Sequence, residues 1–171
     1  MRVRFLAPAL ALALAAPLLA QQQDFSKVEV KAEKVAEGVY VLTGAGGNIG
    51  LSIGKSGSLV IDDQYAPLSD KILAAIKALT PDPVRYVVNT HWHGDHTGGN
   101  ENLSGEGALI VAHENVRRRM SAEQVNSFFQ RTTPPSPEKA LPVVTYAESV
   151  TLHLNGEEVR CTHLPPAHTD G

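Results

Sequence analysis

Three histidines and an aspartate lie within the six residues His91–His96, which read HWHGDH. Neutral imidazole nitrogens and carboxylate oxygens are the ligands that zinc accepts in proteins. His91 and His93 are two residues apart, so both side chains can face one side, while Gly94 permits a turn that carries Asp95 onward. So dense a set of ligands favours two neighbouring metal ions over a polar loop that only happens to be rich in histidine.

A regular element must position these ligands, and the apolar run 84–88, shortly before them in the sequence, predicts a strand. Similar patterns predict further strands at 39–42, 49–53, 58–61, 108–112, 143–146, 150–154 and 159–163. A hairpin is expected around Gly54 to Gly57. Another is expected across Asn155-Gly156, because an Asn-Gly pair favours a type I′ turn.

Helices are expected from Pro67 up to Pro81, where apolar residues keep helical spacing, and over residues 114–121. A proline-rich loop is expected over residues 132–137. Strands that alternate with helices and mix with hairpins indicate an α/β (α+β) sandwich.

The H-x-H-x-D-H pattern after a strand resembles the signature of the metallo-β-lactamase-fold metallo-hydrolase superfamily. The strand 59–62 resembles its upstream strand, which ends in an aspartate, and the segment 167–171 resembles the one that supplies the next ligand. The resemblance covers residues 34–171, and it implies a metallo-β-lactamase-type αβ/βα sandwich, mainly its N-terminal half.

The resemblance implies the ligands of two zinc ions: His91, His93 and His168 for the first, and Asp95 and His96 for the second. Asp62 would hydrogen-bond the loop that carries them, although Asp63 offers the same group and a simple turn role is the alternative. Gly44 to Asn48 lies where the family places a mobile substrate-facing hairpin, and a plain turn would explain its glycines equally well.

Zinc lowers the pKa of a bound water to about 7. The metal-bound hydroxide would then attack an ester, amide, lactam, lactone or thioester. Asp95 is the expected catalytic residue, because it can bind the second ion and orient or relay a proton. Two alternatives stay open: an iron-dependent dioxygenase of sulfur compounds, which the same superfamily includes, and a non-catalytic metal-binding remnant.

The family pattern continues past the third ligand with a metal-bridging aspartate and a further histidine, whereas this sequence ends at Gly171. The sequence is therefore interpreted as a domain that is incomplete at its C-terminus. Two zinc ions are expected in the full-length protein, and about one is expected to be held tightly here, because the second would keep only two protein ligands.

Residues 1–20 are expected to be a signal peptide. Two arginines precede an apolar run that is short for a membrane span and is interrupted by Pro8 and Pro17. An uncleaved N-terminal anchor is the alternative. Residues 21–33 are polar and are expected to form a loose lead-in. A secreted or periplasmic location follows, with no stable membrane association after cleavage.

The net charge of −3 argues against nucleic acid or an anionic membrane surface as partner and favours a small-molecule substrate. It does not indicate an oligomeric state. The only basic run, Arg117–Arg119, is interpreted as a solvated helix face. Cys161, the only cysteine, is expected in the core, and His113, His153 and His163 are expected to be structural.

Overall fold

Within residues 24–128 and 130–171, which the computed structural model describes, seven strands form one mixed sheet. Their spatial order is β1 (Lys31–Ala36), β2 (Val39–Thr43), β3 (Ile49–Ser52), β4 (Ser58–Ile61), β5 (Val84–Asn89), β6 (Leu109–His113) and β9 (Val144–Tyr146). The strands from β1 to β4 pair antiparallel, and those from β4 to β9 pair parallel. The predicted signal peptide lies outside the described residues.

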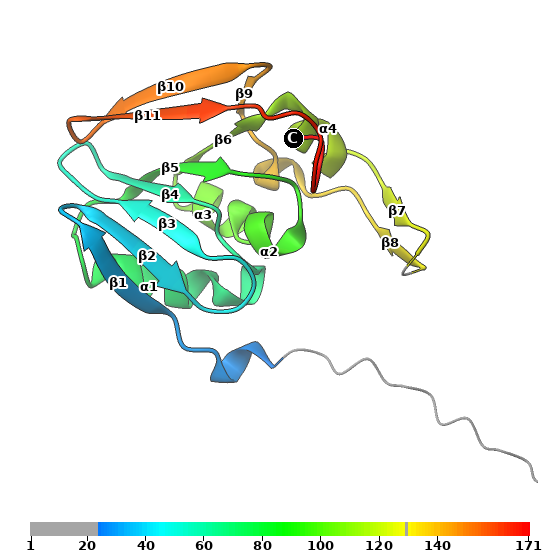
Figure 1. The fold of residues 1–171 in the computed structure, drawn as a ribbon. Coiled ribbons are helices and arrows are strands. Elements are labelled where there is room, and N and C mark those ends of the chain that lie inside the picture. Colours follow the sequence, from blue (N-terminus) through cyan, green and yellow to red (C-terminus); the bar gives the residue numbers. More distant parts are fainter. Residues whose placement is uncertain (1–23, 129) are drawn as a thin grey trace, which may run out of the picture.

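The central strands are buried on both faces, because successive side chains of a strand point to opposite sides of the sheet. Val60 of β4 and Val87 of β5 pack into the larger core cluster, which includes the helix residues. Their neighbours Leu59 and Val88 pack into a second cluster on the other face. Figure 1 shows the resulting layers, with helices on one side of the sheet and a hairpin on the other.

The helices on the first face are η2 (Ala66–Leu68), α1 (Ser69–Lys77), α2 (Gly94–Thr97) and α3 (Asn100–Gly105). Leu68, Ile72 and Ile76 recur at helical spacing and are buried, so the predicted helix from Pro67 is confirmed, with a 3-10 first turn. A further helix, α4 (Glu114–Met120), follows β6 and ends one residue before its predicted end. No helix in the described part of the chain is long and apolar enough to cross a membrane.

The second face is covered by the hairpin of β10 (Ser149–Leu154) and β11 (Glu157–Thr162). Val150 and Cys161 pack against the sheet, which agrees with the expected place of the cysteine. Asn155 and Gly156 connect the strands with φ values of 57° and 82°, as a type I′ turn requires, and the predicted hairpin is confirmed. The predicted α/β sandwich is therefore present as a large sheet with a small second sheet beside it.

The N-terminal segment is more regular than the loose lead-in expected up to residue 33. A short helix, η1 (Phe25–Lys27), precedes β1, which begins at Lys31. Lys71 Nζ anchors this segment by donating hydrogen bonds to the carbonyls of Phe25, Ser26 and Val28. All residues of β1 are exposed. Because the strand has no buried face, its sequence does not need the apolar alternation that would predict a strand, and it lacks that alternation.

One further hairpin, which the sequence did not predict, overlaps the start of the expected proline-rich loop. It pairs β7 (Gln124–Asn126) with β8 (Arg131–Thr133), and η3 (Glu138–Ala140) follows it. Both strands are short, and nearly all of their residues are exposed, so hydrophobic periodicity could not reveal them.

Candidate metal centre

The metal loop, residues 90–96, begins where β5 ends at Asn89. β4 runs parallel to β5, so the residue after β4, Asp62, reaches the base of the same loop. In α/β proteins, bound molecules and ions lie at this edge of the sheet, outside the carboxyl ends of the strands. The carbonyl of His93 accepts hydrogen bonds from the backbone N–H groups of His96 and Thr97, at 3.0 and 3.1 Å, which turn the chain into α2.

His91, His93 and His168 converge on one point. One donor nitrogen of each ring lies within 4.8 Å of the donors of the other two. The distance from His168 Nε2 to His93 Nδ1 is only 3.1 Å, although the residues are 75 apart in the sequence. Among the described residues, His91 Nε2 is buried without a hydrogen-bond partner. A metal ion fits this donor set, because coordination would satisfy the unpaired nitrogen.

The surroundings keep two of these imidazoles neutral, which is the form that binds metal. Burial, together with the neighbouring rings of His96, His93 and His168, lowers the pKa of His91 to about 4. Burial and the adjacent His168 ring lower the pKa of His93. Neither ring therefore has to lose a proton at neutral pH before it can coordinate.

Asp95 and His96 form a second donor pair beside the first set. His96 Nε2 lies 3.4 Å from Asp95 Oδ2, and the ring centroids of His96 and His91 are 4.0 Å apart. The structure thus brings all five predicted ligands together at one edge of the sheet. One imidazole and one carboxylate next to three imidazoles suit two neighbouring ions.

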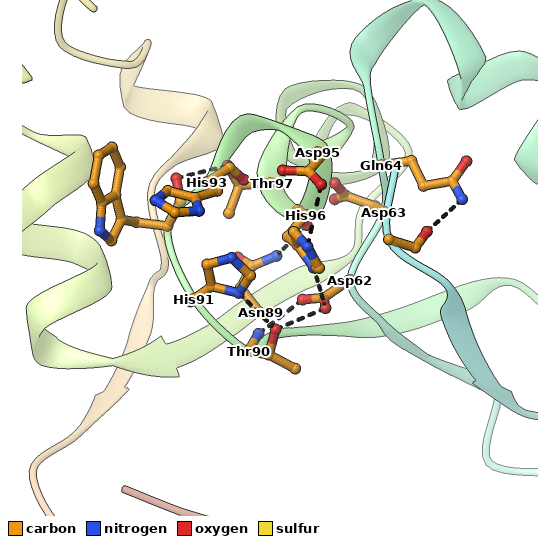
Figure 2. A network of polar contacts seen from close by, with 12 residues as sticks. Asp62, Asp63, Gln64, Asn89, Thr90, His91, His93, Asp95, His96 and Thr97 are labelled. Atoms are coloured by element: carbon orange, nitrogen blue, oxygen red, sulfur yellow. Dashed lines mark hydrogen bonds and ion pairs between the residues drawn. The ribbon is translucent and has the colours of Figure 1, made fainter. Parts of the chain in front are cut away.

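Asp62 supports the metal loop, as Figure 2 shows. Its carboxylate accepts the Thr90 backbone N–H at 2.8 Å and the Thr90 hydroxyl at 2.7 Å, and it lies 2.7 Å from His96 Nδ1. Because Nδ1 of His96 is engaged here, Nε2 faces Asp95. Burial raises the pKa of Asp62, and the hydrogen bonds from Thr90 and His96 oppose that shift. The Asp62 carboxylate hydrogen-bonds the metal loop, whereas Asp63 bonds it only through its backbone N–H, which donates to the His96 carbonyl at 3.0 Å.

Asp63 and Gln64 hold neighbouring segments, a role that sequence reasoning missed. Asp63 accepts the Gly99 N–H at 2.8 Å behind the metal loop, and burial raises the pKa of this carboxyl well above its usual value. Gln64 reaches the other way: its Oε1 accepts the Ala45 N–H at 3.2 Å and its Nε2 donates to the Gly47 carbonyl at 2.5 Å. The available signal was three consecutive polar residues directly after a buried strand.

The loop that Gln64 holds, residues 44–48, lies directly against the second donor pair. A Cβ added to Gly46 would lie 2.7 Å from Cβ of Asp95, and one added to Gly47 would overlap the ring of His96. The two glycines are therefore required for close approach, which goes beyond the needs of a plain turn.

The segment that carries His168 is anchored on α4. Asp170 accepts hydrogen bonds from Nε and Nη2 of Arg119 at 3.2 and 2.9 Å, and Nη2 of Arg118 lies 3.6 Å from the same carboxylate. The hydrogen bond from Arg119 lowers the pKa of Asp170. The interpretation of residues 117–119 as a solvated helix face is therefore incomplete: the Arg119 side chain is partly exposed, and it also joins two distant segments.

The other histidines lie outside the converging set. His113 caps α4 by accepting the Asn115 N–H at 3.3 Å, and its ring stacks on that of His163 at a centroid distance of 3.8 Å. His153 is exposed on β10. Trp92, which belongs to the metal loop, packs against the buried cluster that includes Val116 and Met120 of α4.

A cleft of about 980 Å³ opens beside the ligands. His93, Asp95 and His168 border it on one side, and residues of α4 and of the β7–β8 hairpin border it on the other. Trp92 and Met120 add apolar surface to the lining. Concave sites of this size, with a few convergent polar groups, suit a small molecule.

Known proteins resemble this chain in sequence and in fold. Residues 42–171 match the family model of the metallo-beta-lactamase superfamily. A metallo-β-lactamase of Cronobacter sakazakii with a HARLDQ motif is 24% identical, with a TM-score of 0.65, over 84% of this chain and 56% of that chain. The corresponding values for a subclass B3 metallo-β-lactamase of Bradyrhizobium japonicum are 19%, 0.68, 84% and 55%. A curated relative, the beta-lactamase-like protein 2 homolog of Caenorhabditis elegans, is 33% identical over 57 residues, 32% of this chain and 19% of that protein.

The likeness to the solved structures concerns the fold, and the chain spans about half of their length. The family match extends over most of the sequence and includes both the metal loop and His168. The sheet order, the converging histidines and the family match agree with one another. The chain belongs to the metallo-beta-lactamase superfamily, whose fold and metal-binding character it shares.

Proposed function

We propose that the protein is a zinc-dependent hydrolase of a small molecule. The observation that carries this proposal is the convergence of His91, His93 and His168, whose donor nitrogens lie within 4.8 Å of one another beside a cleft. These three residues would hold the first ion. Asp95 and His96 would contribute to a second, and the full-length protein would hold two ions.

Zinc, when bound, acidifies a coordinated water toward neutral pH and polarises a carbonyl group. The chain itself would supply proton transfer and orientation. Asp95 borders the cleft, and its Oδ2 can accept a proton there and pass it on. Asp62 holds the His96 ring through Nδ1, and Gln64 holds the glycine loop against the same side of the site.

The substrate class follows from this chemistry: an ester, amide, lactam, lactone or thioester small enough for the cleft. Lactams receive no preference, because a fold of this kind does not specify its substrate. We also propose export to the periplasm, since residues 1–20 have the pattern of a signal peptide. Recovery of the protein from a periplasmic fraction tests export, and its absence there would contradict it; N-terminal sequencing of that protein tests cleavage, which a chain that still begins at Met1 would contradict.

The central test compares His93→Ala with His153→Ala. Purified wild type is expected to contain zinc and to hydrolyse at least one member of a panel of chromogenic lactams, lactones and thioesters. His93→Ala should lose the first ion and all hydrolysis, because His93 supplies one of three convergent nitrogens. His153 is exposed on β10, so its variant should keep both properties.

Full zinc content and hydrolysis in His93→Ala would overturn the proposal. Iron in place of zinc, with oxygen consumed in the presence of thiols and no hydrolysis, would also overturn it. That second result would support the sulfur dioxygenase considered from the sequence.

A further inference from the structure

His168 differs from the other candidate ligands in the way it is supported. It is exposed and follows β11 on a segment without helix or strand, whereas His91 and His93 leave a central strand directly. A side chain on such a segment loses conformational entropy when it is held for coordination. Some contact must therefore keep His168 Nε2 at its position 3.1 Å from His93 Nδ1.

The strongest candidate for that contact is the ion pair two residues further on. Nε and Nη2 of Arg119 donate to the two oxygens of Asp170 at 3.2 and 2.9 Å, in the forked geometry that arginine favours with carboxylates. The remaining nitrogen, Nη1, reaches Gln124 Oε1 of β7 at 3.4 Å. Arg119 thus ties the segment of His168 to α4 and to the wall of the cleft.

A second bond from the same helix reinforces the tether. Asn115 Nδ2 donates to the backbone carbonyl of Asp170. Asn115 and Arg119 are four residues apart, so they lie on one face of α4, and both bind Asp170. Within the segment, the Ala167 N–H donates to the Thr169 carbonyl at 3.0 Å and closes a tight turn that carries His168. Figure 1 shows this C-terminal segment lying beside α4.

We propose that Arg119 is a positioning residue for the metal site: through its ion pair with Asp170, it holds His168 where a third imidazole can complete the coordination of the first ion. Arg119 itself does not coordinate the ion. The inference rests on the proposed role of His91, His93 and His168, and it adds a residue from outside the metal-ligand motifs. Its effect should appear in metal affinity before it appears in the stability of the fold.

Binding of Co²⁺, used as a spectroscopic substitute for zinc, tests the proposal on the whole chain. Asp170→Asn keeps the size of the side chain and the backbone carbonyl bonds, and Arg119→Gln removes the cation. Each should weaken Co²⁺ binding about tenfold, the effect typical of residues that orient a metal ligand. The cobalt absorption bands should also shift as one imidazole becomes partly detached. Arg119→Lys should recover part of the affinity, because lysine keeps the charge without the fork.

Two further variants provide the controls. Arg85→Gln removes a cation from an exposed position near the start of β5 and should leave Co²⁺ affinity and spectrum unchanged. The double variant Arg119→Gln/Asp170→Asn should bind Co²⁺ no more weakly than either single variant, because both remove the same contact. Unchanged Co²⁺ affinity and spectrum in Arg119→Gln and Asp170→Asn would overturn the proposal, as would fully additive losses in the double variant.

Hydrogen exchange in the metal-free chain separates this inference from the proposed function. Arg119→Gln should speed amide exchange in residues 163–170 and leave β5 and the metal loop unchanged. If wild type binds no Co²⁺, the metal-centred function fails while the exchange experiment still tests the tether. If wild type binds Co²⁺ and the variant neither binds it more weakly nor exchanges faster, the tether fails alone.

Discussion

The two sides of the metal centre are supported in different ways. On the Asp95–His96 side, the supporting residue is Asp62, which is only 4% exposed. Its carboxylate hydrogen-bonds both Thr90 and His96. On the His168 side, the supporting Arg119 side chain is 42% exposed. Buried hydrogen bonds are costly to break, whereas exposed ion pairs contribute about 0–1 kcal/mol to stability and are screened by salt. We therefore expect the Asp95–His96 side, called the rigid side below, to be rigid, and the position of His168 to depend on solution conditions.

The largest effect should come from Asp62→Ala. The substitution leaves the Thr90 N–H and the His96 ring without their buried acceptor, and it places alanine at a φ of 61°. The free energy of unfolding should fall by about 3 kcal/mol or more. Urea denaturation measures this loss, and Asp62→Asn, which keeps an acceptor oxygen and tolerates positive φ, should lose less. Equal and small losses in both variants would show that the rigid side does not depend on Asp62.

A smaller effect should distinguish two substitutions of Gln64. Its φ is 56°, so glycine relieves backbone strain and alanine does not, while both remove the bonds to Ala45 and Gly47. Gln64→Gly should therefore be more stable than Gln64→Ala by about 1 kcal/mol. In both, amide exchange in residues 44–48 should accelerate to the same extent. If only the alanine variant loosened this loop, the side-chain bonds would not be what holds it.

The smallest effect concerns salt. The Arg119–Asp170 pair is partly exposed, and the Debye length falls to about 3 Å at 1 M salt. Co²⁺ affinity of wild type should therefore weaken by about twofold between 0.05 and 1 M sodium chloride. Asp170→Asn should show no such decline from this source, since its ion pair is already absent. A steeper decline in the variant than in wild type would contradict an electrostatic tether.

The sequence predicted the ligands of the metal loop, because they are close together in the chain. The HxHxDH spacing and the apolar strand before it are local patterns, and the structure brings His91, His93 and His96 together directly after β5. The Asn155-Gly156 hairpin was equally predictable, because the turn chemistry lies in two adjacent residues.

The remaining contacts depend on where distant segments meet. Gln64 bonds a loop 17 to 19 residues away, and Arg119 bonds a carboxylate 51 residues away. Nothing in the run of three arginines distinguishes Arg119 from its neighbours. The exposed strands β1, β7 and β8 escaped detection for a different reason: without a buried face, a strand needs no apolar alternation.

X-ray absorption at the zinc edge, on the chain loaded with one equivalent of zinc, reports directly on whether His91, His93 and His168 hold the first ion. We expect scattering from at least three imidazole rings, with zinc–nitrogen distances of about 2.0–2.1 Å. His93→Ala should lose that pattern. A zinc–sulfur distance of about 2.3 Å, which would place Cys161 on the metal, or scattering from a single imidazole would rule out His91, His93 and His168 as the ligands of the first ion.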